Sequence, residues 1–299
     1  PIQLASYRPE NFERNFLGPL SATDALVRSR NIPALELFRT LRPSSLYNFF
    51  AAGGIERLLP EEHYGIALVL GGFGANSEEV AQLYGLLGTG LLGTDGELRS
   101  LKFTNDQVKT VATPPLLSTE AAFLVREMLS KNPPALGRFR ELHIPWKTGT
   151  SFGSRDAWAA GLVGRYVLVV WLGNFDGRSN PNLVGRDFAG PVFFSMVDRL
   201  VARGALASMP LAPLVNLKKV KVCALSGALA GPDCPHEKES WFIPGVSPIK
   251  SCELHRRVQI NPESGLRLCA GESGGEERVF ELWDSGMQKL FERAGLRRN

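Results

Sequence analysis

Two short groups of residues in this chain combine side-chain types and spacing that could serve acyl transfer. In Lys147-Thr148-Gly149-Thr150, a cation and two hydroxyls flank a glycine in a segment typical of a strand. Strand side chains alternate, so Thr148 and Thr150 share one face and Lys147 takes the other. Gly149 lets a second backbone lie close. We expect an extended peptide to add here, its carboxylate held by the two hydroxyls and the lysine charge. The structural alternative is a strand start followed by a glycine bulge.

The second group, Ser29-Arg30-Asn31, lies in a predicted break between two helices. A serine can relay a proton, and an asparagine two residues later can bind a peptide carbonyl and orient a lysine. Ordinary turn chemistry before Pro33 would also favour these residues. The order S-x-N and then K-T-G matches two of the three elements of the serine acylases that use S-x-x-K, S-[DX]-N and K-T-G.

The remaining element, S-x-x-K, supplies the nucleophilic serine and its lysine in such enzymes. It does not occur before Ser29. The match Ser247-Pro248-Ile249-Lys250 follows K-T-G and lies in a cysteine-rich region, which is the wrong order and context for a nucleophile. Two explanations remain open. The nucleophile lies upstream of Pro1, or the protein is a non-catalytic relative that keeps the cleft.

The elements that must position these groups follow from periodicity and capping. Apolar stripes predict helices on both sides of a break at 29–32 and within residues 44–59, 76–87, 118–131 and 188–204. Strand patterns with glycine-marked turns predict a meander over residues 145–151, 157–164 and 166–174. The predicted fold class is α+β, with helices packed on an antiparallel sheet. A linker is expected over 205–215, and an amphipathic helix over 277–296.

Composition limits the partners. The net charge is +4 and no run of five basic residues occurs, so a nucleic-acid footprint is absent. The run "YVLVVWLG" is far shorter than the roughly 20 apolar residues of a membrane-spanning helix. The four cysteines all fall in the last third of the chain, which predicts a separate small module stapled by disulfides or by a metal.

Several segments together resemble a known family. "YRPENF", "SATDALVRSRNIPAL", "WKTGTSFGSRDAWAAGL" and "VVWLGNFDG" resemble the transpeptidase domain of class A penicillin-binding proteins. The later "VCALSG", "FIPG" and "PIKSCELH" resemble the segment that follows it in the 1C subtype. The resemblance implies a transpeptidase domain over 1–207, without its S-x-x-K segment, and a linker with a small module over 208–299. "PIQLASYRPENF" begins within the family pattern, which favours a nucleophile upstream.

The resemblance also implies an activity. In that family a serine attacks the D-Ala-D-Ala carbonyl of a peptidoglycan stem peptide, and an amine of a neighbouring stem then takes the acyl group; β-lactams acylate the same serine. By resemblance, Lys147 and Ser29 assist proton transfer and Asn31 positions substrate and base. Thr148 and Thr150 bind the terminal carboxylate, and the Thr150 N–H is an oxyanion donor. A silent domain that binds wall peptides or partners, and a DD-carboxypeptidase, are the alternatives.

The same resemblance sets the expected surroundings. The substrate-binding set is Thr148, Gly149, Thr150 and Ser151. The partners are stem peptides, β-lactam antibiotics and the upstream part of the same protein, and no cofactor is expected. A glycosyltransferase domain and the membrane anchor would precede this chain. The protein would work in the periplasm, at the extracytoplasmic face of the inner membrane.

The cysteines permit two chemistries. An oxidising compartment favours disulfides among Cys223, Cys234, Cys252 and Cys269, whose three possible pairings the sequence cannot separate. The less favoured alternative is a zinc site of the Cys₃His type, built from Cys223, Cys234, Cys252 and His255.

Overall fold

The described residues form two compact units. The computed structural model describes Asn11 and residues 18–88, 115–206, 216–269, 272–293 and 295–296. The first unit holds Asn11 and the described residues from 22 to 206; the second holds residues 18–21 and those from 216 onward. The boundary predicted between residues 207 and 208 lies outside the described residues, so its position stays a prediction.

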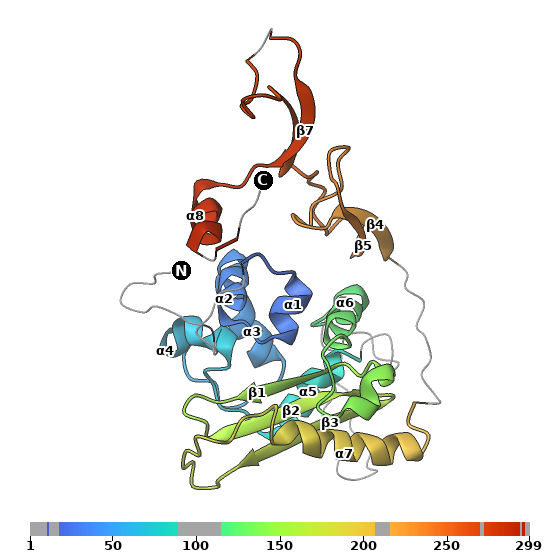
Figure 1. Cartoon of the computed structure of the whole chain (residues 1–299). Coiled ribbons are helices and arrows are strands. Elements are labelled where there is room, and N and C mark those ends of the chain that lie inside the picture. Colours follow the sequence, from blue (N-terminus) through green and yellow to red (C-terminus); the bar gives the residue numbers. More distant parts are fainter. Residues whose placement is uncertain are drawn as a thin grey trace. The chain divides into compact units, whose positions relative to one another are not determined.

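A three-stranded antiparallel sheet organises the first unit (Figure 1). Its strands are β1 (Trp146–Thr150), β2 (Asp156–Val163) and β3 (Tyr166–Gly173), in that order. The predicted meander and the predicted combination of helices with an antiparallel sheet are confirmed. β1 pairs with β2 on one side, and no described strand pairs with its other side. Among the described strands, β1 therefore lies at the edge of the sheet.

The core lies between the sheet and α7 (Ala189–Ala202), which crosses in front of the sheet in Figure 1, while α5 (Ser77–Leu86) lies behind it. In β2 and β3 the residues that share the α7 face are small or branched, because they must accept the aromatic side chains of the helix. Phe193, Phe194 and Val197 of α7 pack on Trp146 and on Ala157, Ala159, Val163, Leu168 and Val170. This core fixes the plane of β1.

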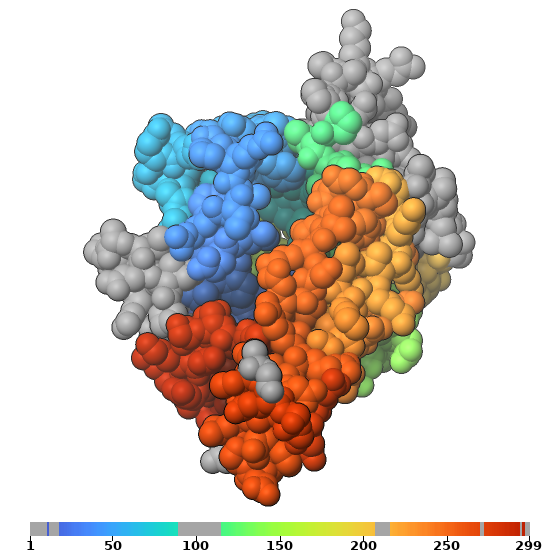
Figure 2. Space-filling model, turned by 90° about the horizontal axis from the view of Figure 1, so that it is seen from above, coloured from blue at the N-terminus to red at the C-terminus, as the bar shows by residue number. Residues whose placement is uncertain are grey.

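Short helices complete the unit: α1 (Ala22–Val27), α2 (Asn31–Thr40), α3 (Ser45–Ala52), α4 (Glu61–Tyr64), α5 (Ser77–Leu86) and α6 (Thr119–Leu129), with 3-10 helices at Gly65–Leu70 and Gly137–Leu142. In Figure 2 the blue-to-cyan helices α1 to α4 form one continuous surface. Asn76 caps α5 reciprocally with Glu79, and the Ser118 hydroxyl oxygen accepts from the Ala121 N–H at the start of α6. The helices predicted within 76–87 and 118–131 begin directly after these two caps.

The second unit is built from two hairpins and one helix. β4 (Lys218–Cys223) pairs with β5 (Glu237–Phe242), β6 (His255–Ile260) pairs with β7 (Glu276–Glu281), and α8 spans Ser285–Arg293. The described part of this unit buries few apolar side chains, namely Val222, Cys223, Leu254, Ile260 and Phe291. Such a small core leaves most of its stability to other interactions.

The single helix predicted over 277–296 is wrong in its first part. Residues Glu276–Glu281 form β7, because backbone pairing with β6 overrides the local helical pattern. The helix begins only after Asp284, whose carboxylate accepts from the N–H groups of Gly286 and Met287 at 2.9 and 3.0 Å. This N-cap is a sequence signal that the apolar periodicity concealed.

Candidate functional site

The turn after α1 holds Ser29 in a left-handed conformation. The Ser29 N–H donates to the Leu26 carbonyl at 3.1 Å, and the Arg30 N–H donates to the Ala25 carbonyl at 2.9 Å. These two bonds define a Schellman ending with Ser29, at φ 52°, in the position that usually takes glycine. A side chain there costs about 1–2 kcal/mol. The turn keeps a hydroxyl where the backbone alone would favour glycine, which points to a functional use for that hydroxyl.

The next helix starts under a second constraint. Asn31 is the first residue of α2, and the buried Asn11 accepts from the Ile32 N–H at 3.3 Å. Asn11 is the only described residue of the "YRPENF" segment. Its contact over 21 positions helps to fix where α2 begins. Ser29 therefore lies on a short connection whose two ends are both fixed by hydrogen bonds, and Asn31 begins the helix that follows it.

Lys147 reaches this connection from β1. Its ammonium donates to the Ser29 hydroxyl, 118 positions away in the sequence, and to the Thr148 carbonyl at 2.7 Å. Burial and, to a lesser extent, the positive charge of Arg186 lower the pKa of Lys147 to about 8. A lysine with this pKa can give up and regain a proton near neutral pH. The structure thus brings together two of the residues predicted to assist proton transfer.

The start of β1 is fixed by Asn132. Its side-chain amide donates to the Trp146 carbonyl at 3.0 Å, and its backbone carbonyl accepts from the Trp146 indole N–H at 3.1 Å. Trp146 and Asn132 are both buried. This reciprocal pair positions the backbone directly before Lys147.

The outer edge of β1 presents the backbone groups of Thr148 and Thr150. The Pro145 carbonyl and the Ser151 N–H both bond to β2, each at 3.0 Å. Alternate residues of an antiparallel strand turn their N–H and C=O groups to the same neighbour. Lys147 lies two residues after Pro145, so its backbone N–H and C=O also face β2. The backbone groups of Thr148 and Thr150 therefore point to the outer edge. An extended peptide could pair with this edge.

A loop after β3 returns to cover part of β1. The Gly185 N–H donates to the Thr150 hydroxyl oxygen at 2.9 Å. A Cβ at Gly185 would lie 2.3 Å from the Gly149 carbonyl oxygen, so the contact requires glycine. The loop also brings Arg186 close enough to Lys147 to affect its pKa. Lys147 and Arg186 therefore both contribute positive charge to this part of the unit.

Ser151 has a clear structural contact. Its hydroxyl oxygen accepts from the Asp156 N–H at 2.9 Å and closes the turn between β1 and β2. Asp156 in turn accepts from the Trp171 indole N–H at 2.9 Å. A role of Ser151 in substrate binding stays a prediction.

Some candidates lie elsewhere in the structure. Ser247 accepts from the Ile243 N–H at 2.9 Å, and Lys250 pairs with Glu253 at 3.0 Å, so both ends of the S-x-x-K match make local contacts in the second unit. All four cysteines are free thiols in the structure, and none of the predicted disulfides is formed. Instead, ligand atoms of Cys223, Cys234, Cys252 and His255 lie within 4.8 Å of one another.

Sequence reasoning missed Asn11, Asn132, Gly185 and Arg186. The first three act through backbone contacts that no local pattern displays. Arg186 lies 39 positions after Lys147, in a loop whose return to β1 could not be read from spacing. The glycine before Arg186 was the one available signal, because glycine is common where a backbone must approach another group closely.

Comparison with known proteins places these features in context. A family model described as "Penicillin-binding protein 1A, C-terminal domain" matches residues 215–257. The chain is 30% identical to "Penicillin-binding protein 1C" of Escherichia coli K12, covering 95% of this chain and 38% of that protein. It is 27% identical to "Penicillin-binding protein 1A/1B" of Bacillus subtilis 168, covering 86% and 31%. The chain thus spans about a third of the length of these relatives.

Solved structures show the same fold. The crystal structure of penicillin-binding protein 1A from Haemophilus influenzae superposes with a TM-score of 0.64 and 21% identity, covering 84% of this chain and 44% of that one. PonA1 from Mycobacterium tuberculosis gives a TM-score of 0.51, with 20% identity and coverage of 68% and 61%. Among the residues that the structure describes, no helix is both long and apolar enough to cross a membrane.

Proposed function

The chain belongs to the class A penicillin-binding proteins, and on that premise we propose that it forms the substrate-binding part of a peptidoglycan DD-transpeptidase. In this proposal the nucleophilic serine and its lysine come from an S-x-x-K segment of the same protein that is not in this sequence. The observation that carries the proposal is the contact of the Lys147 ammonium with the Ser29 hydroxyl beside the outer edge of β1.

Substrate placement follows from the edge strand. An extended D-Ala-D-Ala peptide pairs with the outward groups of Thr148 and Thr150, and its terminal carboxylate lies near Lys147 and Arg186. The Thr150 hydroxyl oxygen already accepts from Gly185, so its own proton is oriented away from that bond and can be donated to the carboxylate. The Thr150 N–H points to the same edge and serves as an oxyanion donor.

Proton transfer uses Lys147 and Ser29. When the serine oxygen bonds to the penultimate carbonyl carbon, the serine proton passes to the lysine of the same S-x-x-K segment. The C–N bond to the terminal D-alanine breaks, and the departing amine must gain a proton. Lys147 supplies it through the Ser29 hydroxyl, with which it is in contact. In the second half-reaction an acceptor amine attacks the acyl-enzyme, the C–O bond to the serine breaks, and the serine oxygen regains its proton from the S-x-x-K lysine. The excess proton of the amine returns to Lys147 through the Ser29 hydroxyl. Because its pKa is about 8, Lys147 can donate the proton in the first half-reaction and accept it in the second.

The same geometry serves related outcomes. Water in place of the acceptor amine would give a DD-carboxypeptidase, and a β-lactam would take the position of the peptide. A silent peptide-binding domain would use the edge of β1 without turnover. We place the protein, like the penicillin-binding proteins it resembles, at the extracytoplasmic face of the membrane. There it would meet peptidoglycan stem peptides.

The test separates binding from turnover. This chain should bind an acyl-D-Ala-D-Ala peptide, and the same peptide with a terminal amide should bind at least tenfold more weakly, as loss of a charge-assisted contact predicts. Lys147→Met and Arg186→Gln should reduce the difference in affinity between the acid and the amide. Arg165 is exposed in the turn between β2 and β3, so the control variant Arg165→Gln should leave that difference unchanged. Calorimetric titration measures each affinity. Equal affinity for the acid and the amide would refute the carboxylate site.

Turnover is tested on the longer protein. A version that includes the preceding segment should be labelled by a fluorescent penicillin, and Ser29→Ala or Lys147→Met should slow labelling. Peptide binding without any acyl-enzyme detectable by intact mass spectrometry would favour the silent binding domain. Release of D-alanine without cross-linked product would favour the carboxypeptidase.

A further inference from the structure

Three cysteines and one histidine from separate segments meet in the second unit. Cys223 ends β4, Cys234 lies in the turn before β5, and Cys252 precedes His255, the first residue of β6. Their ligand atoms all lie within 4.8 Å of one another. Cys223 and His255 are buried, with 0% and 5% of their surface exposed.

Two distances in this cluster match those around a tetrahedral metal ion. With Zn–S and Zn–N bonds of about 2.3 and 2.0–2.1 Å, tetrahedral geometry puts sulfur and nitrogen about 3.5 Å apart. The His255 Nδ1 lies 3.5 Å from the sulfur of Cys223 and 3.5 Å from the sulfur of Cys252. An S–S bond would instead require two sulfurs at about 2.0 Å.

Each of the three sulfurs also accepts a hydrogen bond. The Ser226 N–H donates to Cys223 at 3.5 Å, the Gly231 N–H donates to Cys234 at 3.3 Å, and the Ser226 hydroxyl donates to Cys252 at 3.3 Å. A thiolate is a far better acceptor than a thiol or a disulfide sulfur, so this pattern is typical of metal-bound cysteine. It is independent of the distances among the ligands.

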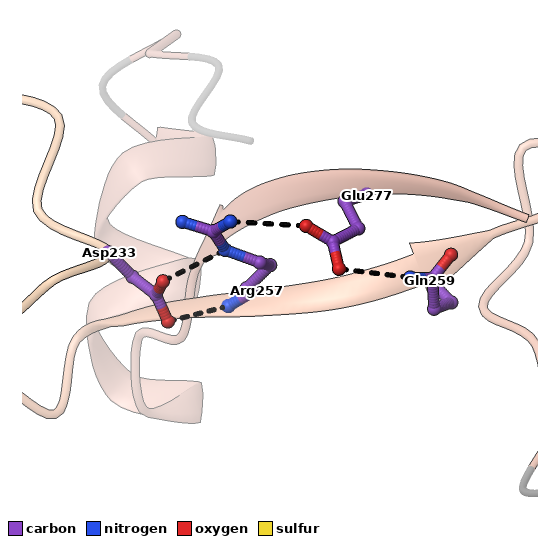
Figure 3. A network of polar contacts seen from close by, with 4 residues as sticks. All are labelled: Asp233, Arg257, Gln259 and Glu277. Atoms are coloured by element: carbon purple, nitrogen blue, oxygen red, sulfur yellow. Dashed lines mark hydrogen bonds and ion pairs between the residues drawn. The ribbon is translucent and has the colours of Figure 1, made fainter.

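A polar network holds the segments that carry two of these residues. Arg257, two residues after His255, donates from its side chain and its backbone to Asp233, at 3.0 and 3.1 Å (Figure 3). Asp233 directly precedes Cys234. Arg257 also bonds Glu277 at 3.1 Å, and Glu277 accepts from Gln259 at 3.2 Å. The network thereby fixes the Cys234 turn against the strand that begins with His255.

We propose that Cys223, Cys234, Cys252 and His255 bind one zinc ion that holds the second unit together. Four protein ligands leave no open position, so the site is structural and not catalytic. Thiolate sulfur and imidazole nitrogen select zinc over the hard cations calcium and magnesium. Besides Cys223, the described part of this module buries only four apolar side chains, so a metal crosslink would add substantially to its stability. The proposal does not depend on the transpeptidase activity.

The first test measures metal on the intact chain. The purified protein should contain about one zinc ion per chain, as a closed four-ligand site requires. After chelation and reduction, added Co²⁺ should give the absorption bands of a tetrahedral site with thiolate ligands. A chain that holds less than about a tenth of an equivalent of zinc, and that takes up neither zinc nor cobalt when reduced, would overturn the proposal.

Variants assign the ligands. Cys223→Ser and His255→Ala should lose most of the bound zinc, whereas Cys269→Ser and His236→Ala should keep it, because Cys269 and His236 are exposed and lie outside the cluster. Ser226→Ala should weaken zinc binding by about 10- to 100-fold, since it removes the hydroxyl bonded to Cys252. If a ligand variant fails to fold, the metal content and cobalt spectrum of the unaltered chain still decide the question.

Thiol counting separates zinc from disulfides. The chain, denatured with a chelator but without reductant and then alkylated, should show four reactive thiols by mass spectrometry. A chain with two fewer reactive thiols and no zinc would contain a disulfide and would refute the site.

Discussion

At the scale of single residues, the site depends on a hydroxyl kept at a conformational cost. Ser29→Gly and Ser29→Ala both remove the hydroxyl, but only glycine relieves the left-handed backbone. We expect Ser29→Gly to be more stable than Ser29→Ala by about 1 kcal/mol, and both to be slow in acylation when tested in the longer protein. Denaturant unfolding measures the difference. An alanine variant as stable as the glycine variant would show that the turn is not strained.

The protonation of Lys147 gives a second prediction. Because burial lowers its pKa to about 8, the free site carries the ammonium below that pH and loses it above. Affinity for a peptide carboxylate should therefore be nearly constant from pH 6 to about 7.5 and should fall as the pH rises past about 8. Lys147→Arg, which stays charged, should remove this decline. Titration calorimetry over the same range measures it; a flat profile in the unaltered chain would contradict the assigned charge.

The lowered pKa of Lys147 also affects folding stability, and this effect changes with pH in the opposite direction to the effect on carboxylate binding. An unfolded lysine titrates near 10.4, so between about pH 8 and 10.4 the unfolded chain binds more protons than the folded one at this position. The contribution of Lys147 to the free energy of unfolding therefore rises with pH between about pH 8 and 10.4. Below about pH 8 the folded chain bears the full free-energy cost of burying the lysine charge.

How far single residues could be predicted varied with the signal. The order of Ser29-Arg30-Asn31 and Lys147-Thr148-Gly149 was enough to propose one site, and the structure joins Ser29 to Lys147. The strained φ of Ser29 could not be predicted, because a serine where glycine is usual gives no signal of the turn. Arg186 could not be predicted because its position depends on the path of a whole loop.

At the scale of elements, the contact of the loop with β1 depends on the absence of a side chain. Gly185→Ala would place a Cβ 2.3 Å from the Gly149 carbonyl oxygen and 2.9 Å from that of Trp158. We expect a loss of about 2–4 kcal/mol in unfolding free energy, together with weaker carboxylate binding as Arg186 moves. Gly74→Ala, where a Cβ would meet nothing within 4 Å, should change stability by less than about 0.5 kcal/mol. Similar effects of the two variants would argue against a tight loop.

Elements with a strong local signal were predicted, and those formed by distant pairing were not. The helices that follow Asn76 and Ser118 and the three strands of the sheet could be located because periodicity and capping are local properties. β7 was mistaken for helix because its partner β6 begins 21 positions earlier, across a turn-rich segment. Only the pairing, and not the residues themselves, decides in favour of a strand there.

At the scale of the whole molecule, the two units are stabilised in different ways. The first has an aromatic core between α7 and the sheet, and the second has small hairpins around the cysteine cluster. Removal of zinc with a chelator should raise hydrogen exchange in residues 218–260 by at least tenfold and leave residues 146–173 unchanged. Exchange measured by mass spectrometry with and without chelator tests this. A uniform change, or none, would contradict separate stabilisation.

The edge of β1 has a consequence for the molecule in solution. An unpaired strand edge can recruit the same edge of a second molecule and begin aggregation. Here the Lys147 ammonium occupies the outward Thr148 carbonyl and places a charge beside it. Two such edges would bring like charges together, whereas a peptide that ends in a carboxylate would not. The lysine charge therefore also disfavours pairing of two β1 edges, and it favours a strand that carries a negative charge.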